Sequence, residues 1–108
     1  MTVATTSPIQ AALEAVLETL GEPDLNSPAH LNSFTAYQAG DAAAVRRFAA
    51  SNLEDHYCRS LGYLISAKLK PDLPTIAVVL AEAARAAADY AREREMKKLG
   101  AILAEALS

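Results

Sequence analysis

The densest group of chemically reactive side chains is the run Asp-His-Tyr-Cys-Arg at residues 55–59. A cysteine nucleophile needs a base within hydrogen-bond reach and surroundings that lower its pKa. Successive side chains on a helix point about 100° apart, so His56 cannot serve Cys58, and only His30 from another segment could. We therefore expect Cys58 to be a small apolar residue at a helix interface. A ligand-binding or enzymatic bundle that uses His30, His56, Tyr57 and Cys58 remains the alternative.

Other kinds of chemistry have less support in the sequence. The two histidines and the single cysteine lack the spacings typical of zinc or di-iron sites. The four glycines are isolated, so no glycine-rich phosphate loop occurs. In a helix-turn-helix built from residues 28–50, the second helix would present only Arg46 and Arg47, too few to read bases and anchor phosphates. We predict no catalytic residue, no cofactor and no metal, and we keep a DNA-binding regulator only as an alternative.

The composition favours helices. Alanine makes up 24 of the 108 residues, tryptophan is absent, and phenylalanine and tyrosine together number six. Alanine is the best helix former and a poor strand former. With 52% hydrophobic residues the chain can bury one modest core. We predict a single all-α domain over residues 1–108, a compact bundle of about five helices, with residues 1–6 as a flexible tail.

Start and stop signals define the first three helices. Ser7-Pro8 and Ser27-Pro28 each place a capping serine before a proline at the first helical position. Gly21 and Gly40 are natural residues to follow a helix end, and Asp41 can cap the next helix. These signals predict helices over residues 8–20, 28–39 and 42–50.

The fourth helix is predicted from a capping-box pattern. Ser51 and Glu54 have the Ser-x-x-Glu spacing in which each residue satisfies a backbone group of the other. A helix over residues 52–70 follows, in which Leu53 and Leu69 would complete an apolar stripe.

The last segment, residues 73–107, is predicted to be one long helix or two helices joined near Gly100. Asp72 is its expected cap. Apolar residues recur at helical spacing both before and after residues 91–96, but the two sets are offset from each other. Such an offset predicts a kink or a rotation around residues 91–96.

Charge is distributed unevenly along the chain. The net charge is −3, but residues 1–45 hold five acidic residues and no lysine or arginine. Glu14 and Glu18 lie on the polar side of the first predicted helix. This acidic surface either packs against the more basic residues 46–108 or docks on a basic partner and speeds association.

The alanine-rich part of the last helix offers a second candidate surface. Alanines surround Arg85 and Asp89, and small side chains allow another helix to approach closely. That face either packs within the chain or forms the seam of a homodimer or the groove for a partner helix.

Targeting signals are missing from the sequence. The first ten residues have neither a basic region nor an apolar core, the longest strongly apolar stretch is too short to cross a bilayer, and there is one cysteine. We expect a cytoplasmic protein that binds neither membranes nor nucleic acid. The function that these observations favour is a small non-enzymatic protein–protein interaction module, of the bacterial adaptor, chaperone or anti-activator type, acting as a homodimer. Its expected partner-binding residues are Glu14, Glu18, Ala83, Arg85, Ala87, Asp89, Tyr90 and Arg92.

Overall fold

Five α-helices and no strand account for the regular structure of residues 8–69 and 73–108, the part of the chain that the computed structural model describes. This confirms the all-α prediction. In chain order the helices are α1 (Pro8–Leu20), α2 (Pro28–Ala39), α3 (Ala42–Ser51), α4 (His56–Leu69) and α5 (Leu73–Leu107).

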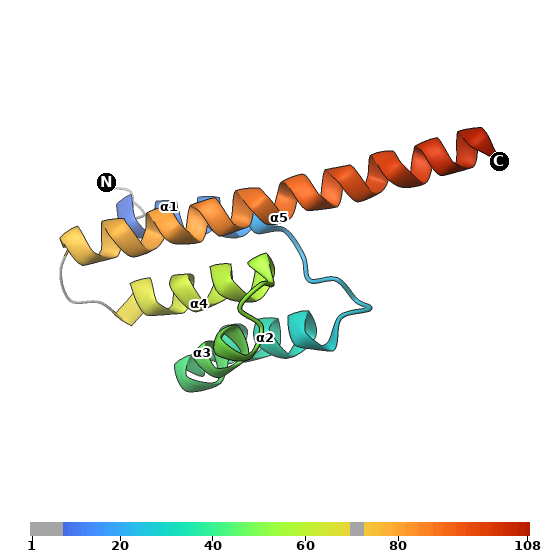
Figure 1. Cartoon of the computed structure of the whole chain (residues 1–108). Coiled ribbons are helices and arrows are strands. Elements are labelled where there is room, and N and C mark those ends of the chain that lie inside the picture. Colours follow the sequence, from blue (N-terminus) through green and yellow to red (C-terminus); the bar gives the residue numbers. More distant parts are fainter. Residues whose placement is uncertain (1–7, 70–72) are drawn as a thin grey trace, which may run out of the picture.

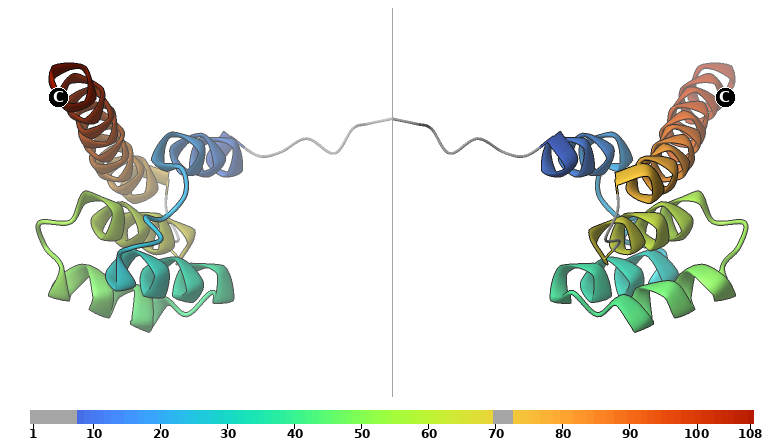
Figure 2. Two further views of the ribbon diagram at one scale, coloured as in Figure 1. Left: turned by 90° about the vertical axis from the view of Figure 1, so that its right-hand side faces the viewer. Right: turned by 90° about the vertical axis from the view of Figure 1, so that its left-hand side faces the viewer.

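Helix α4 lies in the middle of the fold. It contacts each of the other four helices, while α1 also packs on α5 and α2 also packs on α3. Viewed end-on, α1 and α5 form one layer, α4 the next, and α2 with α3 the third (Figure 2). A helix surrounded in this way must be apolar on several sides. The side chains of Tyr57, Leu61 and Leu64 on α4 are accordingly fully buried.

The turn residues act as the sequence predicts. The hydroxyl of Ser27 accepts a hydrogen bond from the backbone N–H of His30 at 3.2 Å and so caps α2. Gly40 ends that helix with φ of 75°, a conformation that other residues rarely adopt. Asp41 caps α3 through the N–H of Ala44. The predicted bounds of α1 and α2 are confirmed, and α3 runs one residue further than predicted.

The predicted start of α4 is wrong. Helix α3 continues through Ser51, so this residue cannot cap a helix, and a turn at residues 52–54 follows. The cap of α4 is Asp55, whose Oδ1 accepts from the N–H groups of Tyr57 at 2.9 Å and Cys58 at 3.2 Å. Leu53 therefore lies in a turn and is exposed.

At its other end α4 closes with Leu69, which is also exposed instead of completing the apolar stripe. The predicted last residue, Lys70, the cap Asp72 and the tail at residues 1–6 lie outside the described residues.

The alanine face of α5 packs inside the chain. Ala83, Ala86 and Ala87 are buried, and the Ser60 hydroxyl on α4 donates a hydrogen bond to the carbonyl of Ala83 at 2.9 Å. Small side chains let α4 and α5 approach this closely. Ala83 and Ala87 are fully buried within the single chain, so neither is exposed to a second copy in this structure.

Helix α5 continues without interruption through residues 91–96 and Gly100. Its far end projects beyond all the other helices (Figure 1). The Cα radius of gyration is 15.7 Å, against about 13 Å for a compact domain of this length. The structure thus confirms the first of the two predicted alternatives, one long helix and not two helices joined near Gly100. The two offset apolar sets face opposite sides of this helix.

None of the helices within residues 8–69 and 73–108 combines the length and hydropathy needed to cross a membrane.

Candidate functional site

A polar cleft of about 530 Å³ opens where the α1–α2 loop, the turn before α4 and helix α5 meet. Carboxylates dominate its walls. The charged and aromatic side chains that line it are Glu22, Asp24, Glu54, Asp55, Glu93, His30, His56, Tyr90, Arg94 and Lys97.

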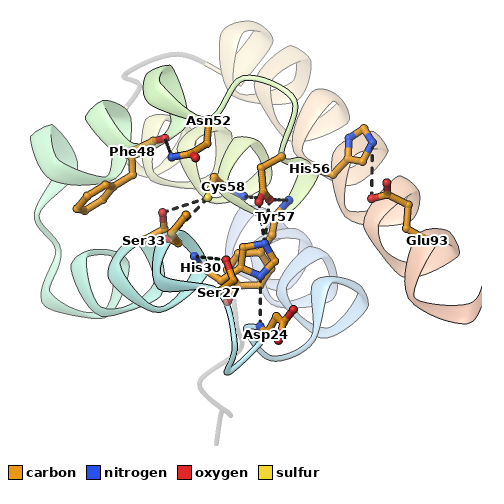
Figure 3. A network of polar contacts seen from close by, with 12 residues as sticks. Asp24, Ser27, His30, Ser33, Phe48, Asn52, His56, Tyr57, Cys58 and Glu93 are labelled. Carbon is orange, nitrogen blue, oxygen red and sulfur yellow. Dashed lines mark hydrogen bonds and ion pairs between the residues drawn. The ribbon is translucent and has the colours of Figure 1, made fainter. Parts of the chain in front are cut away.

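His30 forms the floor of this cleft and is 6% exposed. Its Nδ1 accepts a hydrogen bond from the backbone N–H of Asp24 at 3.2 Å, and its Nε2 lies 2.8 and 3.0 Å from the two carboxylate oxygens of Asp55 (Figure 3). Because a backbone N–H can only donate, the ring proton sits on Nε2 and is donated to Asp55. Both ring nitrogens of His30 are therefore engaged within the chain.

The Asp55 side chain both caps α4 and binds a residue of α2. Its Oδ1 caps α4, and its carboxylate also holds His30, which lies 25 residues away on α2. A carboxylate is favoured at this place because the N-terminal end of a helix carries a partial positive charge. The position of α2 relative to α4 is thus tied to the start of α4.

Three rings pack together beneath the cleft. The His30 ring stacks on Tyr57 with centroids 4.5 Å apart, and Tyr90 from α5 meets His30 edge-on at 5.4 Å and Tyr57 edge-on at 5.3 Å. Burial raises the pKa of both tyrosines. Tyr90, one of the predicted contact residues, packs its ring against His30 and Tyr57 and also lines the cleft.

Arg94 makes the last polar connection between α5 and the bundle. Its Nη1 donates to the carbonyl of Leu20 at 2.8 Å, at the end of α1, and its guanidinium lies 5.2 Å from the centre of the Tyr90 ring. A Cβ on Gly21 would lie 2.7 Å from Nη1, and Gly21 also has φ of 74°. The positive φ favours glycine at this position, and a side chain here would displace the end of Arg94 from its present place.

The thiol of Cys58 is fully buried, as expected for a residue at a helix interface. It accepts a hydrogen bond from the Ser33 hydroxyl at 3.3 Å and donates to the carbonyl of Ala29 at 3.7 Å. Burial raises its pKa. Since both nitrogens of His30 are engaged elsewhere, the geometry does not form the Cys58–His30 pair on which the enzymatic alternative depended.

The second histidine is separate from this network. His56 lies on the side of α4 that faces α5, with its Nε2 3.8 Å from Glu93, and Figure 3 shows the pair apart from His30. Among residues 8–69 and 73–108 there is no group of three or more His, Cys, Asp or Glu side chains that could hold a metal ion.

The two acidic residues of α1 are exposed as predicted. Among the described residues neither Glu14 nor Glu18 forms an ion pair; Glu14 accepts a hydrogen bond from Gln10 on its own helix. Packing of this acidic surface against the basic half of the chain, the first of the two alternatives, is thus not what the structure shows for these two side chains.

Three predicted contact residues lie on the outer side of α5. Arg92 follows the buried Ala83 by nine residues, which is about 180° around the helix axis. Arg85 forms an ion pair with Glu82 at 3.8 Å, and Arg92 pairs with Asp89. Exposed pairs of this kind contribute little to stability, so the side chains stay available.

Beyond this charged stretch α5 carries five large hydrophobic side chains that are 53–85% exposed: Met96, Leu99, Ile102, Leu103 and Leu107. Met96 and Leu103 follow Ala87 by nine and sixteen residues, hence by about 180° and 160° around the axis. We call these five residues the distal stripe.

The sequence showed Met96, Leu99 and Leu103 as part of an apolar repeat. It did not show that these side chains are exposed, because the side of a helix that is covered depends on where the other helices end. The roles of Asp55 and Arg94 were missed for a related reason. For Asp55 the local signal was an acidic residue directly before an amphipathic segment, but Ser51 was a competing candidate for the cap of α4.

Comparisons of the chain with protein-family models, curated proteins and solved structures give no match.

Replacing Asp55 with alanine should lower the free energy of unfolding by about 2–4 kcal/mol, because the cap of α4 is lost and the buried ring Nε2–H of His30 is left unpaired. Urea unfolding followed by circular dichroism measures the change. Glu54→Ala is the matched control, since the exposed Glu54 should change stability by less than about 0.5 kcal/mol. Equal effects of the two substitutions would show that Asp55 does not have this role.

Cys58 should react with iodoacetamide at pH 7 much more slowly than a cysteine in an unstructured peptide, because it is buried and its pKa is raised. Mass spectrometry over time gives the rate, and labelling in urea shows that the thiol is intact. Native labelling as fast as the peptide would restore a reactive cysteine.

Proposed function

We propose that this chain is a small non-enzymatic protein–protein interaction module of the adaptor, chaperone or inhibitor type, acting in the cytoplasm as a homodimer. The distal stripe is the observation that carries this proposal. Five large apolar side chains lie on a helix end that no other described helix covers. Contiguous exposed apolar surface on a small domain marks a site of interaction.

The polar cleft supports a structural role better than a catalytic one. Its most buried polar side chain, His30, uses both ring nitrogens within the chain, and Arg94 spans from α5 to the end of α1. These contacts join α1, α2, α4 and α5. A rigid bundle of this kind holds α5 at a defined angle and so presents the distal stripe to a partner.

The acidic surface of α1 is the second part of the proposed interface. Glu14 and Glu18 are exposed, and nothing basic on the described chain neutralises them. Charges of one sign on a surface attract a partner of opposite charge over distances of about 10 Å at moderate salt and raise the association rate.

A capture experiment tests the distal stripe. The wild-type chain, immobilised in native lysate, should retain a defined protein near one-to-one yield, and the double variant Leu99→Glu/Leu103→Glu should lose it, because charges in an apolar interface are costly to bury. The control is Ala101→Glu/Ala104→Glu, which adds the same charges on the opposite side of the same turns. Circular dichroism checks that all variants fold.

Two results would contradict the proposed function. One is a wild-type chain that retains no protein and stays monomeric. The other is a retained protein that binds the wild type and the distal-stripe double variant equally well.

Reversing the acidic surface, with Glu14→Lys/Glu18→Lys, should slow association by about ten-fold at low salt while leaving thermal unfolding unchanged. The association rate of the neutral variant Glu14→Gln/Glu18→Gln should lie between those of the wild type and the charge-reversed variant. Association rates of the captured partner, measured by stopped flow at several salt concentrations, give the comparison. A rate that does not change with charge would remove α1 from the interface.

A further inference from the structure

Three residues of the distal stripe, together with Ala106, have the spacing of a coiled-coil seam. Met96, Leu99, Leu103 and Ala106 follow one another at steps of three, four and three residues, which is the a/d pattern of a heptad, and Ile102 and Leu107 flank it. Every residue from 95 to 108 is exposed. The seam is thus presented along its whole length, and on the described chain no second helix lies against it.

We propose that a second copy of this chain covers the distal stripe, with the two ends of α5 crossing antiparallel near Ala101. This inference rests on the proposed function and names the partner of that same site. The two-fold axis would pass between the helices, so that each copy buries the same residues against the other.

The pattern of apolar residues selects one register. In an antiparallel pair each a position faces a d position of the other helix, so that facing residue numbers have a constant sum. When that sum is 202, Met96 meets the second copy's Ala106, and Leu99 meets the second copy's Leu103. Every layer of the seam is then apolar. A shift by one heptad would place Leu103 against the second copy's Arg92 and bury a charge, which is costly.

Gly100 lies beside the seam near the crossing point. Nothing lies within 4 Å of the position where its Cβ would be. A residue without a side chain at the crossing allows the two helix axes to approach closely. In the proposed register the two copies' Gly100 residues come together on one flank, and the two copies' Ile102 residues come together on the other.

Charge excludes the parallel arrangement. Arg85, Asp89 and Arg92 lie upstream of the distal stripe on the same outer side of α5. In a parallel pair each of them would face the same residue of the other copy, so like charges would meet at three successive levels. In the antiparallel register none of these three residues faces its own counterpart, because facing residue numbers sum to 202.

The bundles leave room for this pairing. In each copy α1 and α4 pack on the side of α5 that carries Ala83 and Ala87, which is opposite to the distal stripe. Figure 1 shows the far end of α5 extending past the bundle, and the thirteen residues 95–107 span about 20 Å. The bundles of the two copies would therefore lie at opposite ends of the crossed helices.

The size of the contact sets the expected affinity. A stable interface of standard size uses about 20–30 residues and about 800 Å² on each side. The distal stripe and its flanks supply about half as many residues. We expect a weak dimer whose dissociation constant lies roughly in the micromolar range, so that its mass depends on concentration.

Sedimentation of the full chain across a concentration series tests self-association. The wild type should pass from monomer to dimer. Leu103→Lys should weaken dimerisation by at least about ten-fold. Ala101→Lys, on the opposite side of the same turn, should leave it unchanged. Circular dichroism of each variant separates lost association from lost folding.

Disulfide exchange between two variants tests the register. Leu99→Cys chains and isotope-labelled Leu103→Cys chains are mixed in a glutathione buffer, and mass spectrometry counts the cross-linked species. The antiparallel register predicts that mixed disulfides between the two variants exceed those within either variant. The native Cys58 is fully buried and serves as an internal control.

The outcomes separate this inference from the proposed function. A dimer that Leu103→Lys weakens and that forms mixed disulfides supports the inference. Disulfides mainly between identical variants would show a parallel pair and overturn it. A chain that stays monomeric at about 1 mM, far above a micromolar dissociation constant, also overturns it. If that monomer still captures a different protein through the distal stripe, the proposed interaction role stands and its homodimer fails; if it captures nothing, the inference and the proposed function both fail.

Discussion

The hydrogen bond between the Nε2–H of His30 and the carboxylate of Asp55 is the interaction on which the arrangement of the bundle depends. Through it, the residue that caps α4 also holds α2, while Nδ1 of the same ring holds the α1–α2 loop at Asp24. Tyr90 then packs edge-on against this histidine from α5. A buried polar group is costly when unpaired, so these partners must come together for any one of them to be buried.

This network engages His30 and Cys58, two of the reactive side chains of this region, in contacts within the chain. A general base needs a free nitrogen, and a nucleophile needs access and a lowered pKa. His30 has no free nitrogen, and Cys58 is fully buried with a raised pKa. The neighbouring contact of Arg94 with the end of α1 holds α5 against the bundle, and beyond this point the helix projects alone.

The distal stripe offers a physical reason for the end of α5 that projects past the bundle. A helix that extends past its own domain gains no tertiary stabilisation there, and short helical segments by themselves are marginal in water. Apolar residues on such a segment are favourable only where something covers them. Antiparallel pairing with a second copy would provide that cover and would leave the acidic surface of α1 and the charged outer side of α5 available for a third chain.

Local signals were enough to predict much of this protein. Proline, serine and glycine at helix ends act through the backbone of a few neighbouring residues, so the all-α class and the bounds of α1 and α2 follow from the sequence alone. The start of α4 does not follow from the sequence alone, because Ser51 and Asp55 can both cap a helix and only the length of α3 decides between them. Three features depend on contacts between segments 23 to 75 residues apart: which alanines of α5 are buried, which nitrogens of His30 are engaged, and where the cover of α5 ends. Those contacts belong to the tertiary structure, because periodicity shows that a helix has an apolar side but not what lies against it.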